Sequence, residues 1–354
     1  MKNYTKWVAT SIIISTISIA VVLFLTLDKT TISVVKEIKP VYILAAFGLH
    51  ILSFILWGLR IRVMTSALGY KISLIRAYEI VVSGTFVAAL TPSSIGGEPL
   101  RILLLKQDKM PVGKASAVIL GERILDAALK LLAAPFALYL FSGTLSDSRL
   151  KLVIMLGGLF SLVTLILMIY ALMRPQYVKP AVNNLVAWLI RLSGDRKIGD
   201  KLRRLSVSID REIDEFHESI YLFATEARLG LIYGIIYSII YWIVDFSSLP
   251  IVLMGLNQPP SILFSFAAQV LLLLVTVAPL TPGASGVAEL AAATLFSVFM
   301  PAGIIGIAVI GLRAFTFYTN ILVGGFVSFK LLKDTEMIKK YLKQPQSNFE
   351  GCKK

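Results

Sequence analysis

The sequence predicts an all-α polytopic integral membrane protein with about six full spans and two re-entrant helical hairpins. Three observations support this fold class. First, 56% of the 354 residues are hydrophobic and only 16% are charged, whereas soluble domains have about 45–50% apolar and about 25% charged residues. Second, apolar stretches of about 20 residues, the length that crosses a hydrocarbon core, recur along the chain. Third, two further apolar stretches are each interrupted by proline and glycine.

The six predicted spans are long apolar stretches with few charges. They are Trp7–Leu27, Val41–Leu59, Ala115–Leu140, Leu152–Leu172, Gly230–Pro250 and Gly303–Phe329. The first span follows Lys2 and Lys6 and contains no charged residue. Because its apolar stretch is longer than that of a signal peptide, we expect it to remain in the protein as a span.

The two interrupted stretches, Tyr78–Lys106 and Ile262–Phe299, are predicted to enter the membrane and turn back. The segment TPSSIGGEP at 91–99 interrupts the first, and TPGASG at 281–286 interrupts the second. Proline breaks a helix. Irregular backbone is tolerated at membrane depth only when it is buried in protein or lines a wet cavity. Each stretch is therefore predicted to form a re-entrant hairpin.

The basic residues predict an orientation in the membrane. With the N-terminus in the cytoplasm, cytoplasmic segments hold 26 of the 35 Lys and Arg residues and external segments hold 5. This bias satisfies the positive-inside rule. It places the segment 60–76, the loop 174–229 and a basic tail at 331–354 in the cytoplasm, together with both termini. The net charge of +14 indicates the anionic inner face of a cell membrane rather than nucleic acid as the partner.

An internal repeat relates the two interrupted stretches. Residues 77–123 match residues 267–313 without gaps at 14 of 47 positions. The matches include the tripeptide L-T-P and a G-x-R that ends at Arg123 and Arg313. Three predicted spans separate the copies, so the copies enter from opposite sides of the membrane. Inverted repeats of this kind are typical of transporters, and residues 1–330 are predicted to form a single transmembrane domain.

Charges within the third span are candidate functional residues, because an intramembrane charge costs about 2.5 kcal/mol or more. Glu122, Asp126 and Lys130 are spaced at i, i+4 and i+8 and form one stripe, and Arg123 can reach Asp126 at i+3. Two interpretations remain open: a polar lining in which Arg123 binds a phosphate headgroup, or an ion-pair ladder that only packs helices. The repeat favours the first, because Arg123 recurs as Arg313 while the acidic positions do not recur.

The tips of the two hairpins supply the other candidates. A helix that starts at Pro99 would point its positive N-terminal end into the membrane, where anions bind. Glu98 has three interpretations: a helix cap, an i+3 partner of Arg101, or a proton carrier. Glu289 has an equivalent place in the second hairpin, one residue later. The predicted substrate-binding residues of the tips are Thr91, Pro92, Gly96, Gly97, Glu98, Arg101, Pro282, Gly283, Gly286 and Glu289.

Two further polar residues lie in other predicted spans. His50 is expected to be a packing residue rather than a proton relay, and Asp245 either pairs with a cation or carries a proton. The carboxylates proposed for proton coupling are Glu98, Glu122, Asp126 and Asp245. No metal site and no cofactor are expected, because the chain has one cysteine and two histidines. No P-loop, HExxH or GxSxG motif occurs, so we expect the chain not to be an enzyme.

Three motifs resemble the signatures of a known family. They are TPSSIGGEPLR at 91–101, GERILD at 121–126 and TPGASGVAE at 281–289. They are similar to the P-x-x-x-G-G-E-x-x-R, E-R-x-x-D and P-G-x-x-G-x-x-E signatures of the lysylphosphatidylglycerol synthase transmembrane family, also called flippase-like or UPF0104. The resemblance covers nearly the whole chain. It implies a membrane domain that moves lipids between leaflets, without the C-terminal aminoacyl transferase domain of the synthases.

Together, the residues and the resemblance predict a flippase-like or scramblase-like transporter. Its expected substrate is an anionic phosphate-bearing membrane lipid, such as a phospholipid or a polyprenyl-phosphate-linked lipid, held by Arg123 and Arg313 where the hairpins meet. Two alternatives remain open. One is a membrane-embedded lipid-linked glycosyltransferase, and the other is an accessory subunit of a separately encoded lipid-modifying synthase.

Overall fold

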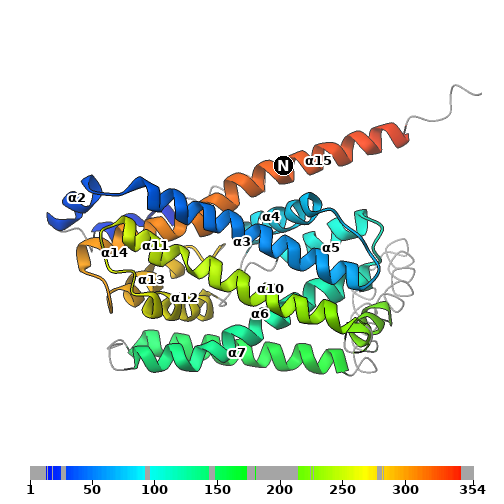
Figure 1. Ribbon diagram of the computed structural model, residues 1–354, viewed down its shortest axis with the longest axis horizontal. Coiled ribbons are helices and arrows are strands. Elements are labelled where there is room, and N and C mark those ends of the chain that lie inside the picture. Colours follow the sequence, from blue (N-terminus) through cyan, green and yellow to red (C-terminus); the bar gives the residue numbers. More distant parts are fainter. Residues whose placement is uncertain are drawn as a thin grey trace, which may run out of the picture.

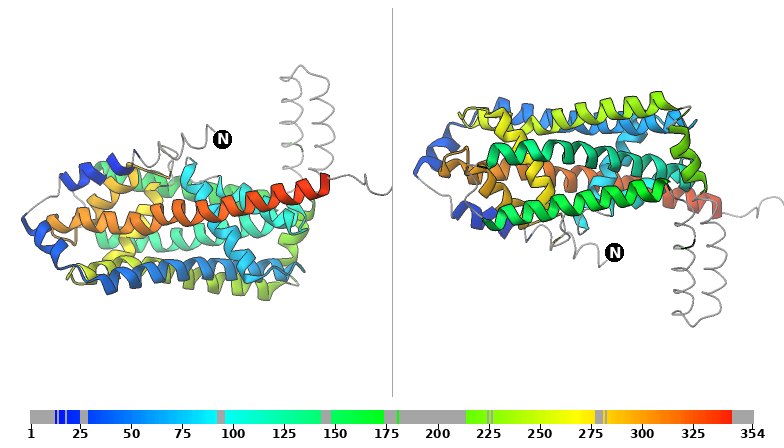
Figure 2. Two further views of the ribbon diagram at one scale, coloured as in Figure 1. Left: turned by 90° about the horizontal axis from the view of Figure 1, so that it is seen from above. Right: turned by 90° about the horizontal axis from the view of Figure 1, so that it is seen from below.

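The computed structural model is all-helical in the part of the chain that it describes. The described residues are 13, 15–17, 19–24, 29–91, 96–142, 148–173, 180, 214–223, 225, 227–276, 281 and 283–343. The long helices run roughly along one common axis (Figures 1 and 2). Among the described residues, four helical stretches are long and apolar enough to cross a membrane, and shorter apolar helices accompany them. The chain is thus a multi-pass membrane protein.

The predicted spans fall on helices wherever the structure describes them. The second, third and fourth coincide with α3 (Pro40–Ala67), α6 (Val112–Phe141) and α7 (Ser148–Met173). The fifth coincides with α10 (Arg228–Phe246), which continues into α11 (Ser248–Gly255). Most of the predicted first span lies outside the described residues, as does most of the loop 174–229. A short helix that was not predicted, α2 (Lys29–Lys36), precedes α3.

The sixth predicted span is a helix with an irregular turn inside it. It consists of α14 (Ala302–Arg313), the π-helical turn η1 (Ala314–Thr319) and α15 (Asn320–Lys343). π-helical turns are rare and frequently occur at functional sites. The tail that was predicted to start at residue 331 begins as a continuation of α15, which extends past the end of the bundle in Figure 1.

The first interrupted stretch forms a helical hairpin of α4 (Leu74–Leu90) and α5 (Gly97–Gln107). The chain leaves the helical conformation at Thr91, whose hydroxyl accepts a hydrogen bond from the Gly96 N–H at 3.0 Å. A Cβ at position 97 would come within 2.8 Å of a backbone oxygen of α4. Glycine at the start of α5 therefore lets the two arms of the hairpin approach closely.

The second interrupted stretch forms a matching hairpin of α12 (Ile262–Thr276) and α13 (Val287–Phe296). Gly283 and Gly286 in its tip have φ angles of +58° and +91°, which favour glycine. Figure 1 shows α4 and α5 nearer one end of the bundle and α12 and α13 nearer the other. The two hairpins therefore occupy opposite halves of the bundle, as expected for an inverted repeat.

The tips of the two hairpins touch through their backbones. The N–H of Gly283 donates to the carbonyl oxygen of Thr91 at 3.4 Å. A Cβ at Gly283 would lie 2.7 Å from the carbonyl oxygen of Ala89 and 2.6 Å from the ring of Phe317. The absence of a side chain at this position is what permits the close approach.

Two clusters of buried apolar side chains hold the bundle together, one around each hairpin. The long helix α6 contributes to both. Its Val118 and Ile119 belong to the cluster around the α4–α5 hairpin, and its Ala137 and Phe141 belong to the cluster around the α12–α13 hairpin. By contrast, α7 exposes many large apolar side chains. This outward apolar surface is typical of a helix that faces lipid.

Candidate functional site

A cluster of four buried charges joins helices α3, α5 and α6. Arg60 of α3 is fully buried and donates from Nε to Glu122 at 2.7 Å. It also donates from Nη1 and Nη2 to the two oxygens of Asp126, at 2.7 and 3.2 Å. Arg101 of α5 donates to the second oxygen of Glu122 at 2.8 Å. Glu122 thus bridges two arginines, and the charges of the cluster balance.

Aromatic side chains surround this cluster. The ring centre of Trp57 lies 5.6 Å from Cζ of Arg60 and 5.0 Å from Cζ of Arg101, within the range of cation–π contacts. The indole N–H of Trp242 donates to Asp126 at 2.9 Å, and the Nζ of Lys130 lies 5.6 Å from the centre of the same indole. The carboxylates of Glu122 and Asp126 are therefore fixed by several donors and are shielded from water.

The prediction that a connection between spans begins at Arg60 is wrong. The helix α3 does not end near residue 59 but continues for two turns to Ala67, and Arg60 lies on its buried face. Two signals in the sequence pointed to this. No glycine or proline interrupts residues 59–67, and Glu122 and Asp126 inside a span require cationic partners.

The two repeat-related arginines form equivalent ion pairs. Arg123 contacts Glu98, and the Nε of Arg313 lies 2.9 Å from Oε1 of Glu289. Both glutamates lie in the first turn of the second hairpin helix, α5 or α13. Each repeat therefore pairs its own arginine with its own glutamate.

These pairs correct two local expectations. Arg123 forms its ion pair with Glu98 rather than with Asp126 at i+3. Glu98 does not pair with Arg101, because Arg101 contacts Glu122. Glu98 lies in the first turn of α5, and among the described residues no hydrogen bond from its side chain caps the start of that helix. Of the three interpretations of Glu98, none predicted its partner, although the repeat had already singled out Arg123.

The two ion pairs differ in exposure. The side chain of Arg123 is 35% exposed, whereas that of Arg313 is only 8% exposed and stacks on Phe317 with its Cζ 4.2 Å from the ring centre. Glu289 also accepts hydrogen bonds from the Ser15 hydroxyl and the Gly286 N–H, both at 2.7 Å. The start of α13 is thus capped by its own glutamate, and the second pair is the more enclosed.

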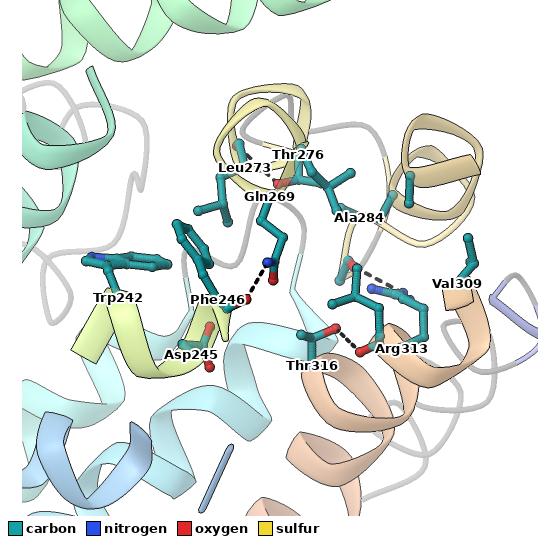
Figure 3. Close-up of a pocket in the computed structure, with 15 residues that line it drawn as sticks. Trp242, Asp245, Phe246, Gln269, Leu273, Thr276, Ala284, Val309, Arg313 and Thr316 are labelled. Carbon is teal, nitrogen blue, oxygen red and sulfur yellow. Dashed lines mark hydrogen bonds between the residues drawn. The ribbon is translucent and has the colours of Figure 1, made fainter. Parts of the chain in front are cut away.

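A pocket of about 180 Å³ lies beside the second ion pair (Figure 3). Its polar lining includes Asp245 of α10, Gln269 of α12, Arg313 of α14 and Thr316 of η1. Gln269 is held in place by a hydrogen bond to the carbonyl oxygen of Phe246 at 2.8 Å. The pocket therefore brings together polar side chains from α10, α12, α14 and η1.

Asp245 and His50 form a contact between α10 and α3. The Nδ1 of His50 lies 3.3 Å from Oδ1 of Asp245, which also accepts a hydrogen bond from the Ser53 hydroxyl at 3.1 Å. His50 packs against Phe54, with ring centres 4.6 Å apart. The packing role expected for His50 is therefore present, but its carboxylate partner was not predicted.

The remaining predicted residues belong to the hairpin tips. Thr91, Gly96, Gly97, Gly283 and Gly286 shape the two turns, and Gly283 also lines the pocket. Pro92 and Pro282 lie outside the described residues. The structure therefore places the predicted site residues in the buried charge cluster, in two separate Arg–Glu pairs, at the touching tips and, for Asp245, in the wall of the pocket. Among the described residues, no ion pair or hydrogen bond joins the two Arg–Glu pairs.

A family model described as the lysylphosphatidylglycerol synthase TM region matches residues 8–324. The chain belongs to this family. The family match spans both hairpins, the charge cluster and the pocket, and it confirms the resemblance that the three motifs indicated.

Curated relatives of this lysylphosphatidylglycerol synthase TM region protein include UPF0104 membrane proteins of two archaea. The one from Archaeoglobus fulgidus is 29% identical over 323 residues, which are 91% of this chain and 96% of the relative. The one from Methanocaldococcus jannaschii is 25% identical over 317 residues, which are 89% of this chain and 91% of the relative. No solved structure matches the chain significantly.

Proposed function

We propose that this protein carries an anionic phosphate-bearing lipid between the two leaflets of the cell membrane. The observation that supports this proposal most directly is the meeting of the hairpin tips, where the Gly283 N–H lies 3.4 Å from the Thr91 carbonyl oxygen. Transporters with inverted repeats bind substrate where discontinuous helices meet, and rocking of the repeats opens that place to either side in turn. In this proposal the two hairpins are re-entrant and both termini are cytoplasmic.

Arginine at both repeats supports phosphate as the group that is bound. A guanidinium has five N–H donors, remains charged and binds two oxygens at once. Among the described residues, both hydrogen bonds of Arg313 come from Nη2. The ion pair with Glu289 therefore does not use all of the N–H donors of Arg313. Arg313 lines the pocket, and Arg123 is one-third exposed. The two glutamates orient these cations, and a phosphate takes the remaining donors.

The role of the neutral charge cluster in this proposal is to support the site. Arg60, Glu122 and Asp126 have few unused hydrogen-bonding groups, because they bind one another. Trp242 belongs to the lining of the pocket and also donates to Asp126. The cluster therefore holds the wall of the pocket in place while the headgroup contacts the repeat-related arginines.

Movement of a labelled lipid in vesicles tests the proposal. The purified protein is reconstituted with a fluorescent anionic phospholipid and without any nucleotide donor, and a membrane-impermeant quencher reports the outer leaflet. We expect the inner-leaflet label to become quenchable in protein-containing vesicles and not in empty ones. Arg123→Ala and Arg313→Ala should each stop the movement. Arg76→Ala is the matched control, because Arg76 pairs with Asp108 away from the pocket.

Other outcomes favour the alternatives. A lipid-linked product that forms only when a sugar donor is added would indicate a glycosyltransferase. Movement that requires a separately encoded lipid-modifying enzyme would indicate an accessory subunit. Wild-type rates in both arginine variants would contradict the assignment of the headgroup site.

A further inference from the structure

Asp245 differs from the other carboxylates of the apolar helices. An arginine side chain contacts each of Glu79, Glu98, Glu122, Asp126 and Glu289. Arginine keeps its charge throughout the physiological pH range, so it favours the ionised form of its partner. Within the described residues, the side-chain partners of Asp245 are His50 and Ser53, and neither carries a fixed charge.

We propose that Asp245 and His50 form a proton-binding site in the wall of the pocket. Oδ1 of Asp245 lies 3.3 Å from Nδ1 of His50, so the proton that the pair binds lies between these two atoms. The Ser53 hydroxyl lies 3.1 Å from the same oxygen and 2.8 Å from the carbonyl oxygen of His50, so its one proton is shared between these two acceptors. Imidazole is the side chain that ordinarily changes charge between about pH 5 and pH 8.

The two members of the pair have different access to water. The side chain of Asp245 is 16% exposed and lines the pocket, whereas that of His50 is only 5% exposed. Nε2 of His50 is buried without a hydrogen-bond partner among the described residues. Buried polar atoms without a partner are rare and call for an explanation. Proton binding by His50 explains this one, because packing alone is served by an apolar ring.

The surrounding charges leave the pair able to change its own charge. Among the described residues, the other charged or titratable side chains around the pair include Arg313 of α14, Tyr241 of α10, Arg60 of α3, Arg123, Asp126 and Lys130 of α6, and Tyr78 of α4. The helices α11 and α12 contribute none. Arg313 is neutralised by Glu289 and Asp126 by Arg60, so neither fixes the charge of Asp245.

A proton on this pair changes what the pocket attracts. Ionised Asp245 places a negative charge in the lining that also contains Arg313, and this charge repels an anionic headgroup. Protonation removes it, so the pocket becomes more positive and binds the headgroup better. Proton binding and headgroup binding thus favour each other, which couples a proton gradient to the lipid movement proposed above. This coupling rests on the proposed function, whereas the proton site itself does not.

Infrared difference spectroscopy on the purified full-length protein tests the site. Acidification should produce a difference band of the pair in the wild type, either the C=O stretch of a protonated carboxyl group or a ring mode of imidazolium, according to which of the two atoms holds the proton. Asp245→Asn should remove this component of the spectrum. Asp108→Asn, a matched substitution in a surface pair with Arg76, should retain it. His50→Gln should shift the pH at which the band appears. A band that persists in Asp245→Asn, or that does not move in His50→Gln, would overturn the site.

Vesicle transport under a pH gradient tests the coupling. The rate for a fluorescent anionic phospholipid should depend on the gradient in the wild type, and Asp245→Asn should lose that dependence. A wild-type rate that ignores the gradient overturns the coupling while the proposed function stands. Vesicles that move no lipid under any gradient overturn the proposed function and the coupling with it, and the infrared band then still decides the proton site.

Discussion

Replacement of Arg60 by methionine should strongly destabilise the protein. Methionine keeps much of the side-chain volume but removes every donor of the guanidinium. Glu122 and Asp126 would then lose a partner while remaining buried between α3 and α6. The exposed fractions of their side chains are 0% and 6%, so water cannot replace the lost donors.

The size of the effect follows from the contacts that are lost. Arg60 makes charge-assisted hydrogen bonds of 2.7, 2.7 and 3.2 Å to the two carboxylates, and hydrogen bonds to charged groups contribute about 1.5–3 kcal/mol each. The loss is smaller than the sum, because Glu122 keeps Arg101 and Asp126 keeps Trp242. Removing one partner of a buried ion pair typically costs about 3–5 kcal/mol, so we expect a loss of about 4 kcal/mol in the free energy of unfolding.

The assay is unfolding in mixed micelles by a denaturing detergent, compared with Arg76→Met as the control. Arg76 also binds two carboxylates, but its side chain is 19% exposed, and partly exposed pairs contribute roughly 0–1 kcal/mol. Arg60→Met combined with Asp126→Asn should be less destabilised than Arg60→Met alone, because one uncompensated charge is removed. A loss below about 1 kcal/mol for Arg60→Met, or one no larger than that of the control, would refute the reasoning.

Two glycine substitutions test the close approaches between helices. Gly283→Ala should destabilise the hairpin tips and slow transport, because position 283 has a φ of +58° and its Cβ would lie 2.7 Å from the carbonyl oxygen of Ala89. Gly48→Ala meets no atom within 4 Å and should be neutral or stabilising in the same assays, so equal effects of both would contradict the prediction. Gly157→Ala should cost about 1–3 kcal/mol through overpacking of α7 against α12. The neighbouring Gly158→Ala, whose nearest contact is at 4.0 Å, is its control in unfolding by detergent, and a loss there as large as at Gly157 would argue against the α7–α12 contact.

The hairpins were predictable because their signals are local. Proline and clustered glycines at 91–97 and 281–286 favour a helix end, and the repeated tripeptide indicated that the two breaks are related. The positive φ angles at Gly283 and Gly286 agree with this. Elements whose ends are set by nearby residues can therefore be located from the sequence.

The ion-pair partners were not predictable from local spacing. Rules for i+3 and i+4 neighbours consider one helix at a time, so they offered Asp126 to Arg123 and Arg101 to Glu98. The observed partners lie on other helices, and only tertiary packing decides which of them meet. Arg60 shows the same limit, because its carboxylates lie 62 and 66 positions further along the chain. A count of basic residues therefore assigned it to a loop.

The pairing of Arg123 with Glu98 and of Arg313 with Glu289 has a consequence for biogenesis. Each pair joins residues that are close in the chain, so a nascent hairpin and the helix that follows it already carry no net charge from these residues. Such a unit can leave the translocation machinery for lipid without waiting for the other half to be synthesised. The two hairpin units can then dock with their repeat-related ion pairs already formed.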